Sequence, residues 1–84
     1  MKTVYCVSWQ AEGEGTCVWS DRPHNADAGF ILYSRVSRPG DLVVRFNLEV
    51  PKDATPDEVS DLADNAMWDK DYVAIETLDR RNES

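Results

Sequence analysis

The chain has 84 residues, of which 42% are hydrophobic and 30% are charged, and its formal net charge is −7. This length suits one domain with a core too small for a deep enclosed site, and the hydrophobic content argues against disorder. No apolar run approaches the roughly 18 residues of a membrane helix, and residues 1–9 lack the features of a secretory leader. We therefore expect a single cytoplasmic domain over residues 1–84, with residues 80–84 as a frayed tail.

The negative charge is concentrated in the second half of the chain. Residues 1–48 contain five acids and five bases, whereas residues 49–79 contain ten acids and only two lysines, a net charge of −8. A surface of this sign repels nucleic acids and anionic membranes and attracts basic protein surfaces. We therefore expect a protein partner with a basic surface, and neither direct nucleic-acid binding nor membrane binding.

The first expected element is a hairpin with strands over residues 3–9 and 16–20. Gly13 and Gly15 lie in the polar connection between them and allow the positive φ that a turn requires. With an even loop length, Cys6 and Cys17 lie diagonally on the same face of the sheet. We expect both to be reduced, although a disulfide across the strands is the alternative reading.

Residues 21–29 are polar and are expected to form a loop, with one helical turn as the alternative. The following segment, residues 30–36, is rich in aromatic and β-branched residues, which favours a strand. A helix from Ala26 to Val36 is the alternative, but Gly29 would lie inside it.

The clearest strand covers residues 42–50, after a turn over residues 38–41. Its hydrophobic residues alternate, so that one row faces the core and the other faces solvent. The inward row consists of Leu42, Val44, Phe46, Leu48 and Val50.

A helix is expected over about residues 55–68, and a last strand over residues 72–78. Thr55, Pro56 and Glu58 give the signature of a helix start, a capping box with proline at the first helical position. Apolar residues then recur at helical spacing and define the buried face. These are Val59, Leu62, Ala63, Ala66 and Met67.

Together these elements predict an α+β fold: a small two-layer domain with an antiparallel sheet of four or five strands. The single helix over about residues 55–68 packs on one face of the sheet. The order of the strands does not follow from the sequence.

No combination of residues predicts catalysis, and we expect a chain that is not an enzyme. The one histidine, His24, lies in the expected loop, with no nucleophile motif beside it. Residues 25–29 and 69–71 resemble the start of a calcium loop but do not continue to the required glutamate. We predict no catalytic residue, no cofactor and no metal.

The candidate binding site is a stripe of acids on the expected helix. Asp57, Asp61, Asp64 and Trp68 are spaced i, i+4, i+7 and i+11, which places them on one line opposite the apolar row. An exposed tryptophan at the end of such a ridge is a favoured interface anchor. The alternative is that the acids form only a solvated helix face and that Trp68 folds into the core. The full expected partner-binding set is Asp57, Glu58, Asp61, Asp64, Trp68, Asp69 and Asp71.

These features favour a non-catalytic protein-binding module, an acidic inhibitor that docks on a basic, nucleic-acid-binding surface. Helical carboxylates can occupy positions that such a surface provides for phosphates. Small phage counter-defence proteins, of the anti-CRISPR and anti-restriction types, have this general character, although no motif links this chain to any one of their families. The alternative is a structural or regulatory subunit that completes a larger assembly through a sheet edge or an aromatic face.

Overall fold

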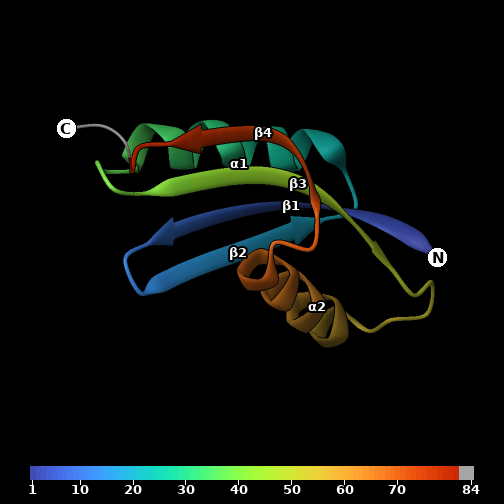
Figure 1. The fold of residues 1–84 in the computed structure, drawn as a ribbon. Coiled ribbons are helices and arrows are strands. Elements are labelled where there is room, and N and C mark those ends of the chain that lie inside the picture. The colour runs from blue at the N-terminus through green and yellow to red at the C-terminus, as the bar shows by residue number, and fades with distance from the viewer. Residues whose placement is uncertain (82–84) are drawn as a thin grey trace.

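The computed structural model describes residues 1–81 as a four-stranded antiparallel sheet with two helices (Figure 1). The sheet order is β2-β1-β3-β4. The α+β class, the antiparallel sheet and the helix over about residues 55–68 are confirmed. The elements in chain order are β1 (Lys2–Ala11), β2 (Glu14–Ser20), α1 (Pro23–Val36), β3 (Leu42–Val50), α2 (Pro56–Asp69) and β4 (Val73–Asp79).

The β1–β2 hairpin is tighter than expected, because the strands extend to a turn of only two residues. Ala11 pairs with Glu14, and Gly13 supplies the positive φ of 75°. The even connection places Cys6 diagonal to Cys17, on the same face and without a disulfide, as predicted. A hydrogen bond with the Cys17 thiol and burial both raise the pKa of Cys6 above its ordinary value.

Residues 23–36 form helix α1, so the predictions of a strand over residues 30–36 and of a loop over most of residues 21–29 are wrong. The alternative helix from Ala26 to Val36 ends correctly but begins three residues too late. The residues that face the sheet follow the helical pattern i, i+3, i+4 and i+7, which outweighs the β-branched and aromatic content. Gly29 is tolerated here because it lies against β1, where an added Cβ would be 3.4 Å from the Val7 side chain. The sheet-facing row consists of Ala26, Gly29, Phe30 and Tyr33.

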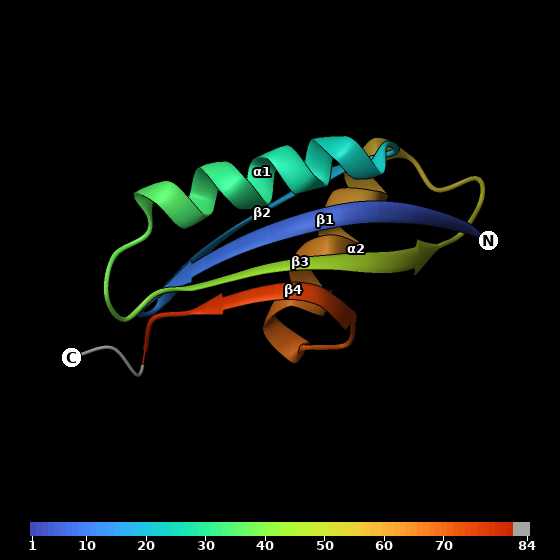
Figure 2. The same ribbon diagram turned by 90° about the horizontal axis from the view of Figure 1, so that it is seen from above.

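The two helices lie on opposite faces of the sheet, which makes three layers (Figure 2). Alternate residues of β3 therefore enter different cores: Val44 and Phe46 pack under α2, whereas Val43 packs under α1. The prediction that the second row of this strand faces solvent is wrong from Val43 to Arg45, because α1 covers it. The predicted arrangement, with one helix on one face of the sheet, therefore lacked α1 and the layer that it forms on the other face.

Arg45 joins α1 to the sheet and is only 4% exposed. Its guanidinium forms an ion pair with Asp27 of α1, donates to the Pro23 carbonyl and lies 5.9 Å from the centre of the Tyr5 ring. These contacts satisfy a charge that would otherwise be costly to bury.

The chain end remains ordered beyond the expected start of the frayed tail. The Arg80 guanidinium donates to the carbonyls of Ser34 and Ser37, at the C-terminal end of α1. Arg81 forms an ion pair with Asp79. The remaining tail residues, 82–84, lie outside the described part of the chain.

Candidate functional site

Helix α2 starts where the sequence predicts and runs one residue further than expected, to Asp69. The Thr55 hydroxyl accepts a hydrogen bond from the Glu58 backbone N–H, and Pro56 occupies the first helical position. Asp57 and Glu58 lie in the first turn, where their charge suits the helix dipole. The helix ends at Lys70, which adopts the left-handed conformation with a φ of 57°.

The buried side of α2 fixes the direction of its acids. Val59, Ala63, Ala66 and Met67 are buried against the sheet. Leu62, the fifth expected member of the row, is partly exposed. Trp19 of β2 donates its indole N–H to the Ser60 hydroxyl at 3.0 Å and helps to set the rotation of the helix.

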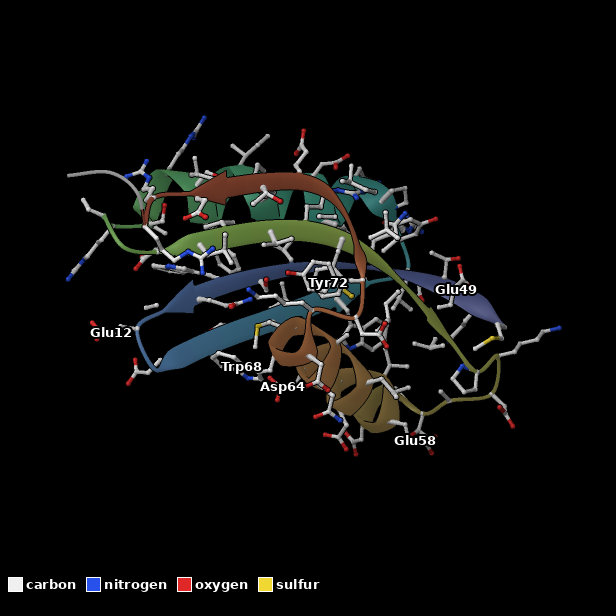
Figure 3. The ribbon with its side chains drawn as sticks, viewed as in Figure 1. Glu12, Glu49, Glu58, Asp64, Trp68 and Tyr72 are labelled. Carbon is white, nitrogen blue, oxygen red and sulfur yellow. The ribbon has the colours of Figure 1, made fainter. Side chains whose placement is uncertain are left out.

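The opposite side of α2 presents the predicted acids to solvent. Asp57, Asp61 and Asp64 are all exposed and share one line along the helix. In Figure 3, Glu58 and Asp64 project from α2 away from the sheet. We call the set Asp57, Glu58, Asp61, Asp64 and Asp69 the acidic face of α2.

No residue of the acidic face forms a salt bridge within residues 1–81. The ion pairs in this part of the chain, Arg45–Asp27 and Arg81–Asp79, both lie away from α2. The first joins α1 to β3 and the second follows β4. The acids of α2 are therefore both gathered on one side and left without a salt bridge inside the described structure.

Trp68 adopts a position between the two expected alternatives. It belongs to the helix and is 47% exposed, so it does not fill the core. One side of its indole lies against Gly15 of β2, where an added Cβ would be only 2.8 Å from Cζ2. The tryptophan thus bridges α2 and the β2 edge, with about half of its surface open at the end of the acidic line.

Asp71 lies apart from this line, in the link between α2 and β4. Its backbone N–H donates to the Ala66 carbonyl, which closes the end of the helix. Together with Glu49 and Lys70 it lines a shallow hollow of about 420 Å³ beside β3. The structure therefore brings six of the seven expected residues together on α2 and places Asp71 at the margin.

Gly15 is the member of this site that the sequence analysis did not identify. The sequence pattern placed Gly15 in the connection of the hairpin, whereas Gly15 lies in β2 and makes room for the Trp68 ring. A prediction of the two-residue hairpin turn would have identified this role, because such a turn places residue 15 inside the strand.

His24 is exposed in the first turn of α1. Across residues 1–81, no three His, Cys, Asp or Glu side chains are grouped so that they could hold a metal ion. A hollow of about 500 Å³ that is open to solvent is lined by Trp9, Ala11, Glu14, Gly15 and Thr16.

Comparisons with known proteins give no match to a family model, to a curated protein or to a solved structure. Neither helix in residues 1–81 has the length and apolar character needed to cross a membrane.

Proposed function

We propose that this chain is a non-catalytic inhibitor that docks the acidic face of α2 on a basic, nucleic-acid-binding surface of a partner protein. Phage counter-defence against CRISPR or restriction enzymes, inside the bacterial cytoplasm, is the setting that suits such an activity. Neither α2 nor the sheet supplies a catalytic group in this proposal, so inhibition results from occlusion.

The observation that carries the proposal is the exposed acidic line of α2, which forms no salt bridge with any residue in the described part of the chain. Asp57, Asp61 and Asp64 are separated by four and three residues, so each repels the next. Like charges at this spacing destabilise a helix by about 0.2–0.5 kcal/mol per pair. The cationic side chains of a basic partner would attract these three carboxylates and so offset the repulsion among them.

The line from Asp57 to Asp64 spans roughly 10.5 Å along the helix, about the axial length of three phosphate steps on one DNA strand. At a rise of about 1.5 Å per residue, the steps along the line are roughly 6 Å and 4.5 Å. Phosphates along one DNA strand follow each other at an axial distance of about 3.4 Å. Three helical carboxylates can therefore reach several cationic side chains of a nucleic-acid groove at once.

Trp68 supplies the apolar contact that an electrostatic interface needs for tight binding. Its half-exposed indole stands at the end of the acidic line, and it is held on its other side by Gly15. A tryptophan that is already fixed loses little conformational entropy on binding. Nucleic-acid-binding surfaces are rich in arginine, and the guanidinium group of arginine stacks well on an indole ring.

The proposal predicts that reversal of Asp57, Asp61 and Asp64 to lysine abolishes partner binding and leaves the fold intact. These side chains are exposed, so the structural cost is confined to the loss of one favourable dipole interaction at Asp57, about 0.3–1 kcal/mol. The measurement is affinity capture from bacterial lysate with the wild type and the triple variant, followed by mass spectrometry.

The matched control reverses Glu12, Asp21 and Asp53, which are exposed and lie outside α2. It changes the net charge by the same amount, so a loss confined to the α2 variant identifies the acidic face. Captured proteins should also dissociate between about 50 mM and about 500 mM salt. Equal capture by both triple variants would rule out the acidic face as the contact.

A second function, as a subunit of a larger assembly, is favoured by the free edge of the sheet. Edge strand β4 exposes the apolar residues Val73 and Ile75. An edge strand offers unpaired backbone groups to another strand. A partner bound in this way would resist salt, and its capture would be lost on substitution of Ile75 by lysine and not on reversal of the acids.

A further inference from the structure

Helix α1 has an apolar side that no described element covers. Ile31, Leu32 and Val36 are 52%, 57% and 48% exposed, although the other side of the same helix is packed on the sheet. In its second half, α1 is apolar nearly all round, a pattern typical of helices that are covered on both sides. We call the residues Ala28, Ile31, Leu32, Arg35 and Val36 the outer face of α1.

The charge distribution makes this side suitable for contact with another copy of the same chain. The five residues of the outer face of α1 include no acid, although Asp27 borders them, and the acidic face of α2 lies on the opposite side of the sheet. Two copies of a chain with a net charge of −7 repel each other. This repulsion is least where the acids are furthest away.

The outer face of α1 is also complementary to itself. In an antiparallel pair of helices centred between Ile31 and Leu32, Arg35 of one copy lies opposite Ala28 of the other. The small alanine leaves room for the arginine stem. The neighbouring Asp27 carboxylate has a side chain that is 58% exposed and can accept the guanidinium of the second copy in addition to its own Arg45. Two-fold dimers need this kind of self-complementary surface.

We propose that the chain forms a two-fold dimer through the outer face of α1. The dimer stacks six layers, with the two acidic α2 helices at opposite outer ends, so it can present two docking faces. The proposal does not rest on the function of those faces. A single pair of helices covers less area than a stable dimer usually buries, about 1,200 Å² or more, so we expect a dissociation constant of roughly 10–500 µM.

Sedimentation equilibrium from about 5 µM to about 1 mM, in about 0.3 M salt, tests the dimer directly. The wild type should convert from monomer to dimer with rising concentration. Ile31→Lys should raise the dissociation constant at least tenfold, because it places a charge in the apolar contact. Arg35→Glu should also raise it, since it adds an acid opposite the Asp27 carboxylate.

The matched control is Ile75→Lys on strand β4, because Ile75 is 51% exposed and Ile31 is 52% exposed. Both variants make the same chemical change at nearly equal exposure, and thermal unfolding shows whether each one folds. The control should dimerise like the wild type.

Three results would overturn the proposal: a monomer up to about 1 mM, a dimer lost in Ile75→Lys and kept in Ile31→Lys, or open-ended growth beyond two copies. The salt dependence of binding distinguishes the dimer contact from docking of α2 on a partner. The dimer should hold or strengthen as salt screens the net repulsion, whereas docking of α2 on a basic partner should weaken.

Discussion

Single side chains fix the corner where α1 leads into β3. Asp41 is buried at this corner and accepts hydrogen bonds from the Arg38 backbone N–H and the Trp9 indole N–H, both at 2.8 Å. The Arg38 N–H, followed by the Trp9 N–H, holds the pKa of Asp41 below its ordinary value of 3.8. This carboxylate joins the turn over residues 38–41 to β1, and the turn forms as the sequence predicts, with Gly40 at a φ of 97°.

Substitution of Asp41 by asparagine should lower the stability of the fold in a pH-dependent way. The lowered pKa in the folded state means that ionised Asp41 stabilises the fold fully above its unfolded pKa, near 3.8. This contribution is lost as the pH falls through the lower, folded pKa. Denaturant unfolding should therefore give a greater difference between wild type and variant at pH 7 than at a pH below the folded pKa of Asp41. A difference that stays constant with pH would contradict this account.

Substitution of Gly15 and of Gly29 by alanine should change the stability of the fold in opposite directions. At Gly15 the added Cβ meets the Trp68 ring at 2.8 Å, so the ring must move and stability should fall by about 1–3 kcal/mol. At Gly29 the nearest contact is an ordinary 3.4 Å to Val7, and alanine in a helix should gain about 0.5–1 kcal/mol. Thermal unfolding gives both signs, and the indole NMR signal of Trp68 should shift only in Gly15→Ala. An unchanged Trp68 signal there would show that the ring does not lie on Gly15.

At the scale of the element, α2 combines good helix signals with a charge pattern that opposes the helix. Its cap, its proline and its buried row all favour the helix, whereas the acidic line costs stability through repulsion. The sequence predicts this helix correctly because cap, period and length agree. The prediction from sequence fails for α1, because this helix has no side-chain cap and contains aromatic and β-branched residues together with a glycine. The packing on β1 and β3, which decides the outcome, is not visible from local sequence.

Asp61→Lys should stabilise the isolated protein by about 1 kcal/mol. The lysine removes repulsion toward Asp57 and Asp64 and creates attractive pairs at spacings i, i+4 and i, i+3. Denaturant unfolding at low salt measures the gain, which should shrink in about 1 M salt because screening removes both effects. The same variant should bind a basic partner less well, so that stability and binding change in opposite directions. A loss of stability would show that the acidic line is not under repulsion.

At the scale of the whole molecule, three layers separate the charge: α2 carries an acidic face on one side, and α1 an acid-free outer face on the other. The acidic face could be predicted from residue spacing alone, because it depends only on one helix and its buried row. The second helical layer, the burial of Arg45 and the support of Trp68 by Gly15 could not. Each of these depends on contacts between segments far apart in the chain.

In the proposed complex, the acidic face of α2 occupies a partner surface that otherwise binds nucleic acid. The most direct test is competition at constant ionic strength, in which a short DNA duplex is added to the immobilised chain with its captured partner. The duplex should release the partner, because both ligands require the same cationic side chains. A partner that stays bound while it also binds the duplex would contradict this arrangement.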